Sequence, residues 1–249
     1  NHRTRKETRN RMKALRIHEF GPVNSLSLDD LATPAPGPHD ILVDVKAAGV
    51  NFPDIMVIEG TYQLLPERPF VPGKEMAGVV TGVGQDVTKF TIGDRVRAPI
   101  EWGAFQEQVC VPEALLHRCP DAMSLTDAAA FNVTYLTAYY ALERRARVNA
   151  GEWVLVTAAA GGVGTAAIQV AKARGARVIG YVGSPGKRSI VEAAGADHTI
   201  DSSQGDLRDL VREITNGHGA DIVLEMVGGK VFESCLRATA WEGRIVCIG

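Results

Sequence analysis

The sequence predicts an α/β protein in which a β-rich domain, residues 12–125, precedes a doubly wound parallel sheet, residues 126–249. Two observations carry this prediction. Before about Pro120, short runs rich in Val and Ile are separated by Gly, Pro and Asp, which is typical of strands joined by turns. After Glu152, apolar strand-like runs alternate with helix-like runs, and such alternation builds a parallel sheet covered by helices on both faces.

The first domain is expected to be β structure up to Pro120, with strands at Ile41–Val45, Ala77–Val83, Arg95–Ala98 and Phe105–Val111. Ser124 and Asp127 match a capping box, and the segment from there through Leu142 predicts a helix. The basic residues 1–11 differ from the rest. We expect a disordered leader or an expression remnant, with a basic targeting or RNA-contacting arm as the alternative.

The second domain is expected to contain five strands, at residues 153–157, 177–181, 198–200, 221–225 and 244–248. Helices ending near residues 174, 194, 214 and 238 separate them, and Gly, Asp or Ser stands at the helix ends. In a sheet of this kind ligands bind beyond the carboxyl ends of the strands.

A glycine-rich turn, Ala160-Gly161-Gly162-Val163-Gly164, joins the first of these strands to its helix. Gly161 and Gly162 lack side chains where a phosphate must approach the backbone, and Gly164 lets the helix pack closely on the strand. A phosphate there meets the free N–H groups at the helix N-terminus. The order strand, turn and helix therefore predicts a dinucleotide site; the alternative is a tight turn that only packs.

The end of the next strand predicts NADPH rather than NADH. NAD sites of this type place an acid there, about twenty residues after the glycines, but residues 181–188 contain none. Ser184 can donate a hydrogen bond, and Lys187 and Arg188 offer positive charge to a 2′-phosphate. Cations are unfavourable at a helix N-terminus, so a nearby anion would explain them, whereas ordinary solvated charges are the alternative.

Composition excludes several other classes. The 249 residues are 45% hydrophobic and 22% charged, with a net charge of −2, so no basic field favours nucleic acid or an anionic membrane. No apolar run approaches the ~20 residues that span a bilayer. The four cysteines are widely spaced, which fits a reduced, cytoplasmic protein.

Several motifs, in this order, resemble the medium-chain dehydrogenase/reductase superfamily and its zinc-free quinone oxidoreductase branch. They are residues 49–54, 60–63, 72–80, 93–96 and 134–139, the glycine turn and residues 195–197. The resemblance runs from Met12 to the last residue and implies a GroES-like domain followed by a Rossmann domain. The resemblance implies that family members continue for roughly eighty residues beyond the position of Gly249, so we expect the Rossmann sheet of this chain to be C-terminally incomplete. It also implies that the full-length protein forms a homodimer.

The comparison with zinc-dependent members implies that no metal is bound. Those enzymes carry a metal-binding Cys where this chain has Asn51, and a His where it has Lys74. An amide and an ammonium are not zinc ligands. Without a Lewis acid, acceptors that take hydride by conjugate addition, such as quinones and α,β-unsaturated carbonyls, are favoured.

The resemblance also implies the roles of individual residues. Asn51 and Thr137 match positions beside the nicotinamide and substrate, Tyr62 matches a tyrosine in the cleft, and Thr134 is added to the cofactor residues. The alternatives are a turn residue for Asn51 and an aromatic lid for Tyr62. At the level of function, an enoyl-thioester reductase and a non-catalytic lens-type or RNA-binding NADPH protein remain open.

Overall fold

The computed structural model describes residues 11–249. The expected leader, residues 1–11, lies outside the described residues except for Arg11, which begins the first strand. The chain divides into two compact units, one ending at Val133 and one running from Thr134 to Gly249, and each is described by itself.

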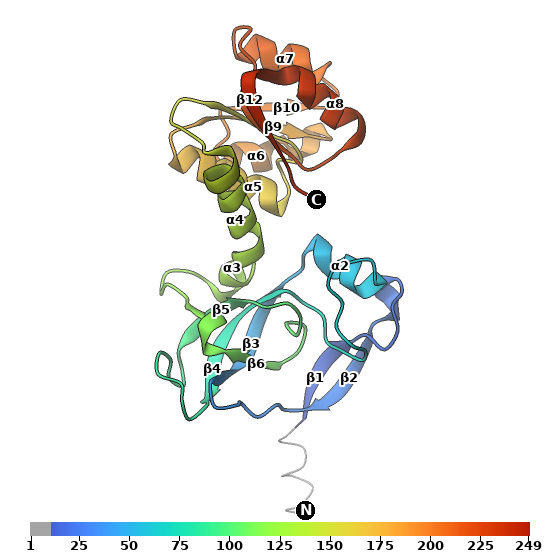
Figure 1. Ribbon diagram of the computed structural model, residues 1–249, viewed down its shortest axis with the longest axis vertical. Coiled ribbons are helices and arrows are strands. Elements are labelled where there is room, and N and C mark those ends of the chain that lie inside the picture. Colours follow the sequence, from blue (N-terminus) through green and yellow to red (C-terminus); the bar gives the residue numbers. More distant parts are fainter. Residues whose placement is uncertain (1–10) are drawn as a thin grey trace, which may run out of the picture. The chain divides into compact units, whose positions relative to one another are not determined.

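The first unit is built on a five-stranded antiparallel sheet in the order β6-β3-β4-β5-β7, beside a separate antiparallel pair, β1 and β2 (Figure 1). Its core is formed by alternate residues of the strands, such as Ile41 and Val43 of β3 and Val109 and Val111 of β6, because successive side chains of a strand point to opposite faces. The bounds are β1 (Arg11–Arg16), β2 (Ser27–Ala32), β3 (Asp40–Gly49), β4 (Glu75–Val83), β5 (Arg95–Pro99), β6 (Gln108–Pro112) and β7 (His117–Arg118), with short 3-10 turns at Val23–Ser25 and Glu113–Leu115.

The expectation of β structure up to Pro120 is wrong for one segment, the helix α2 (Phe52–Glu59). Residues at its two ends favour a helix, although the neighbouring segments have the composition of strands. Asp54 accepts a hydrogen bond from the backbone N–H of Asn51 at 2.8 Å, which caps the first turn. Gly60 ends the helix with a φ of 75°, a conformation that favours glycine.

The single helix expected from Ser124 through Leu142 is also wrong, because it is divided into α3 (Leu125–Ala129), α4 (Asn132–Tyr139) and a π-helical turn, η4 (Tyr140–Ala146). The predicted cap is present, since Ser124 Oγ accepts from the N–H of Asp127 at 3.0 Å. The second start has its own acceptor: Glu75 Oε2 accepts from the N–H of Val133 at 2.9 Å. A helix can begin anew there because its free N–H group is satisfied.

The second unit is built on a five-stranded parallel sheet in the order β10-β9-β8-β11-β12 (Figure 1). Strands and helices alternate along the chain as predicted. The bounds are β8 (Trp153–Val156), α5 (Gly162–Ala173), β9 (Arg177–Val182), a 3-10 turn η5 (Pro185–Lys187), α6 (Arg188–Ala193), β10 (His198–Asp201), α7 (Leu207–Ile214), β11 (Ala220–Glu225), α8 (Gly229–Ala238) and β12 (Thr239–Cys247).

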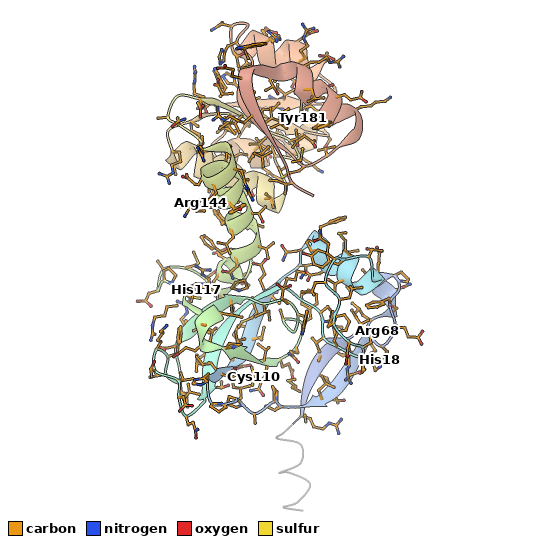
Figure 2. All side chains as sticks on the ribbon, viewed as in Figure 1. His18, Arg68, Cys110, His117, Arg144 and Tyr181 are labelled. Carbon is orange, nitrogen blue, oxygen red and sulfur yellow. The ribbon has the colours of Figure 1, made fainter. Side chains whose placement is uncertain are left out.

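Helices cover both faces of this sheet. Val154 and Val156 belong to a core cluster shared with α4, η4, α5 and α6. Trp153 and Leu155 face the other way, into a cluster shared with α7 and α8, and Tyr181 of β9, labelled in Figure 2, packs against that second cluster. The central strand β8 is apolar at every position because both faces of the sheet are buried there. This is the doubly wound sheet that the sequence predicts.

Within residues 11–249 the structure contains no helix with the length and apolar character needed to cross a membrane.

Candidate functional site

The glycine turn between β8 and α5 is shaped by close backbone contacts. Ala158 takes a φ of 45°, and its carbonyl accepts a hydrogen bond from the N–H of Gly161 at 2.9 Å. A Cβ added to Gly164 would lie 2.5 Å from the Ala158 carbonyl oxygen, so only glycine fits where the helix passes the turn. Gly161 and Gly162 are exposed, which leaves the N-terminus of α5 accessible to a ligand.

Two further predicted residues lie on α4 in the same unit as the glycine turn. A Cβ added to Gly162 would lie 2.9 Å from Cγ2 of Thr134, so the Thr134 methyl group lies against the turn. Thr137 lies farther along α4 and lines an open cavity of about 1120 Å³ with the end of β12. The structure thus places the Thr134 methyl group against the glycine turn and Thr137 on the wall of this cavity.

The positive charges predicted beyond β9 differ in their surroundings. Ser184 is half-buried and its carbonyl accepts from the N–H of Lys187 at 3.2 Å. Lys187 is exposed and makes no ion pair within the described part of the chain. The Arg188 guanidinium, by contrast, binds Asp201 Oδ2 at 3.1 Å and Gln204 Oε1 at 2.9 Å. Lys187 is therefore available to a ligand, whereas Arg188 joins α6 to the end of β10.

Asp201 is held in its ionised form. Hydrogen bonds from the Ser203 side chain and backbone, and from Arg188, hold the pKa of the Asp201 carboxyl below its usual range. Because the carboxylate stays charged at neutral pH, it keeps Arg188 in place. The predicted role of Arg188 at a 2′-phosphate therefore concerns a guanidinium that already binds Asp201 and Gln204.

The residues of the second unit fit a dinucleotide with an additional phosphate. Gly161 and Gly162 present backbone without side chains at a helix N-terminus, where a diphosphate gains N–H donors and a favourable helix dipole. An exposed ammonium, Lys187, follows the neighbouring strand. Residues 183–187 carry no carboxylate that would repel a phosphate on the ribose.

The first unit contains a second polar site, centred on Asn51 and Glu75. The Asn51 side-chain amide donates from Nδ2 to Oε1 of Glu75 at 2.9 Å, and Glu75 is only 1% exposed. Asp54, just as buried, accepts from the Asn51 backbone. Burial raises the pKa of the Asp54 carboxyl, although the Asn51 N–H bond and the charge of Lys74 act in the opposite direction. The predicted residue Asn51 is thus fixed through both its side chain and its backbone.

Tyr62, the other predicted residue of this unit, packs against the side chain of Lys74. The Lys74 ammonium lies 4.5 Å from the centre of the Tyr62 ring. It also binds the backbone oxygen and Oε2 of Glu101, both at 3.2 Å. Lys74 directly precedes Glu75, the first residue of β4, so two neighbouring residues of the chain hold Tyr62 and Asn51.

Large apolar side chains border this polar site in the sequence and are exposed. Val50 and Phe52, on either side of Asn51, are 79% and 73% exposed, and Trp102, next to Glu101, is 40% exposed.

No metal-binding arrangement occurs at either site: residues 11–249 hold no group of three or more His, Cys, Asp or Glu side chains suited to an ion. The amide of Asn51 and the ammonium of Lys74 occupy the first site with other partners.

Sequence reasoning missed three carboxylate or hydroxyl groups that build these sites. Glu75 carries no local signal, since its partners Asn51 and Val133 are distant along the chain. At the carboxyl edge of the parallel sheet, buried Glu225 accepts from the N–H groups of residues 227 and 228 at 2.9 and 3.0 Å. Thr157, which ends the β8 run, accepts from the N–H of residue 226 at 2.8 Å. A polar residue closing an apolar strand is the available signal for both.

Comparison with known families identifies both units. Residues 37–121 match the alcohol dehydrogenase GroES-like domain, and residues 162–249 match the family described as zinc-binding dehydrogenase.

Individual relatives agree with these matches. Quinone oxidoreductase-like protein 2 of Mus musculus is 43% identical over 225 residues, which is 90% of this chain and 64% of that protein. The chain spans 61% to 64% of the length of the mouse protein and of three similarly named relatives.

Solved structures extend the comparison. The quinone oxidoreductase of Pseudomonas syringae pv. Tomato DC3000 is 39% identical, covers 96% of this chain and is covered over 73% of its own length, with a TM-score of 0.88. A mycobacterial protein solved in complex with NADPH is 35% identical over 96% of this chain and 74% of that chain, with a TM-score of 0.86. On fold, domain matches and identity, this chain belongs to the quinone oxidoreductase-like family of the medium-chain dehydrogenase/reductase superfamily.

Proposed function

We propose that the protein transfers a hydride from NADPH to a quinone or an α,β-unsaturated carbonyl compound without a metal ion. The observation that carries the proposal is the exposed Gly161-Gly162 turn at the start of α5, together with Lys187 beyond β9, which is exposed and forms no ion pair within residues 11–249. The similarity to a mycobacterial protein that was solved with NADPH supports the same cofactor.

The second unit supplies the residues for the cofactor. Backbone N–H groups at Gly162, Val163 and Gly164 face the diphosphate, because the first N–H groups of a helix have no partner within it. Ser184 donates to the ribose and the Lys187 ammonium pairs with the 2′-phosphate. NADPH, when bound, supplies a hydride from its nicotinamide ring.

The first unit supplies residues for the acceptor. The Asn51 amide donates one N–H to Glu75, and its remaining N–H can orient a carbonyl oxygen. The Tyr62 hydroxyl is a donor for an oxygen that gains negative charge. The exposed apolar side chains Val50, Phe52 and Trp102 suit a flat conjugated molecule.

Conjugated acceptors fit a protein that works without a Lewis acid. Reduction of an isolated ketone develops a localised alkoxide, which zinc enzymes stabilise with the metal. In a quinone or enone the charge is spread over a conjugated system, so hydrogen bonds from the protein suffice. Asn51 and Lys74, where zinc-dependent members have ligands, are consistent with this chemistry.

The test is acceptor-dependent oxidation of NADPH, followed by the absorbance of the reduced nicotinamide. A naphthoquinone, a small enone and crotonyl-CoA are supplied separately. Oxidation with the quinone or the enone is expected. Oxidation with crotonyl-CoA alone would identify an enoyl-thioester reductase instead. Binding of NADPH without its oxidation by any acceptor would favour a non-catalytic, NADPH-sensing protein.

A further inference from the structure

Lys74 is a buried cation that lies over Tyr62 and directly precedes Glu75, the partner of Asn51. Its side chain is 10% exposed, and a charged group is seldom buried unless it is paired or used. The ammonium lies over the Tyr62 ring at 4.5 Å, and the next residue in β4, Glu75, holds Asn51.

The buried carboxylates of the site accept hydrogen bonds from donors other than the Lys74 ammonium, and Oδ1 of Asp54 has no partner among the described residues. Glu75 accepts from Asn51 Nδ2 through one oxygen and from the N–H of Val133 through the other, each at 2.9 Å. Asp54 accepts from the backbone N–H of Asn51 at 2.8 Å. Neither carboxylate lies within ion-pair distance of the Lys74 ammonium among the described residues, although the charge of Lys74 acts to lower the pKa of Asp54.

The group that does pair with Lys74 holds it loosely. Glu101 contacts the ammonium through its backbone oxygen and Oε2, both at 3.2 Å, whereas charge-assisted hydrogen bonds are usually about 2.7–2.9 Å long. The Glu101 side chain is 63% exposed, and ion pairs with exposed partners contribute little. An incoming oxygen can therefore displace this carboxylate at small cost.

We propose that Lys74 is a catalytic residue whose ammonium binds the carbonyl oxygen of the acceptor and stabilises the charge that develops on it. This inference rests on the proposed function. When hydride adds to the β-carbon of an enone, the carbon–carbon π pair forms the new enolate π bond and the carbonyl π pair moves to oxygen. An N–H of Lys74 hydrogen-bonds to that oxygen. The nicotinamide is oxidised, and a proton from water then completes the saturated ketone.

The first test replaces the ammonium by an uncharged chain of similar length, Lys74→Met. We expect kcat for the enone to fall about 100-fold, as when one donor to a developing oxyanion is removed, with little change in KM for NADPH. The control is Lys46→Met, which removes an exposed ammonium from β3 in the same unit. Unchanged kcat in a folded Lys74→Met protein would overturn the proposal.

A second variant separates a catalytic ammonium from a structural ion pair. Glu101→Gln keeps the positive charge but removes its carboxylate partner, so turnover should be retained or rise. Turnover that falls as far in Glu101→Gln as in Lys74→Met would show that the ion pair matters rather than the free ammonium, and would contradict the proposal.

A binding measurement gives a readout that does not depend on turnover. The phenolate of para-nitrophenol, detected by its visible absorbance, resembles an oxyanion and should bind the wild-type protein about tenfold more tightly than Lys74→Met. Equal affinities would contradict the role of Lys74. Failure of the proposed function gives a different result: the wild-type protein would then not oxidise NADPH, whichever acceptor is supplied.

Discussion

Asn51 donates its side-chain amide to Oε1 of Glu75 at 2.9 Å, and Oε2 of the same carboxylate accepts the backbone N–H of Val133. One buried carboxylate thus orients a predicted site residue and satisfies the start of α4. The orientation has a chemical consequence: with one N–H of Nδ2 donated to Glu75, the second N–H of the Asn51 amide is left for a ligand.

Glu75→Gln should therefore destabilise the first unit. A glutamine keeps the shape but presents an N–H₂ group to one of the two donors, leaving a buried donor unpaired. The expected loss in the free energy of unfolding is about 1–3 kcal/mol, measured by urea denaturation. The exposed Glu67→Gln is the control and should stay within about 0.5 kcal/mol of the wild type. Equal stability of the two variants would show that this carboxylate is not structural.

Gly164→Ala should weaken both stability and NADPH binding. The added Cβ would lie 2.5 Å from the Ala158 carbonyl oxygen, and backbone on both sides must shift. Overpacking of this kind costs about 1–3 kcal/mol, measurable by thermal or urea unfolding, and calorimetry should detect weaker NADPH binding. Gly186→Ala is the matched control, because nothing lies within 4 Å of a Cβ there. A Gly164→Ala protein as stable as its control would contradict the packing argument.

Single substitutions of Lys187 and Arg188 should have different effects on cofactor preference and on stability. Lys187→Ala removes an exposed ammonium that has no ion-pair partner among the described residues, so the preference for NADPH over NADH should fall about tenfold while the unfolding midpoint is unchanged. Arg188→Ala leaves Asp201 without its cation and should lower the unfolding midpoint. Affinities for both cofactors and urea curves of each variant check this. If the Lys187→Ala/Arg188→Ala double variant kept the wild-type preference, NADPH selection would not depend on these residues.

The ionised Asp221 carboxylate should stabilise the second unit at neutral pH and lose this effect at acidic pH. Burial by itself would raise the pKa of Asp221, but hydrogen bonds from His218 and from the Trp153 N–H lower it below its ordinary value overall. A lowered pKa contributes stability above the unfolded value of about 3.9, and this contribution is lost as the pH falls below it.

Asp221→Asn should accordingly be less stable than the wild type at neutral pH, with a difference that narrows below about pH 4. Urea unfolding of both proteins between about pH 7 and pH 3 measures the gap. Asp209→Asn, at a carboxylate with 72% exposure, serves as the control. A gap that stays constant over this range would contradict the assignment.

Local pattern was sufficient for much of the fold. The strands of the second unit could be predicted because both faces of the sheet are buried. Successive residues such as Val154 and Leu155 are therefore both apolar, and they form continuous apolar runs. The glycine turn could be predicted because steric contact at Gly164 excludes a side chain. The helix α2 was missed although Asn51 and Asp54 form a local cap, because neighbouring Val- and Ile-rich runs favoured strands.

Contacts between distant segments account for the rest. Nothing near Val133 in the sequence indicates that Glu75, on a strand of the sheet, accepts its N–H and allows a new helix to begin. The partners of Arg188 likewise follow only from the pairing of β9 with β10, which brings Asp201 beside it. Pairing of side chains across a sheet depends on register, which residue spacing does not specify.

Transfer of isotope tests the central claim most directly. The protein, treated with a strong chelator, is given an enone and NADPH carrying deuterium at the transferring position of its nicotinamide, and the saturated product is analysed by mass spectrometry and NMR. We predict one deuterium on the former β-carbon, at a rate that the chelator leaves unchanged. A product without the label, or activity that disappears on chelation and returns with zinc, would contradict metal-independent hydride transfer from NADPH.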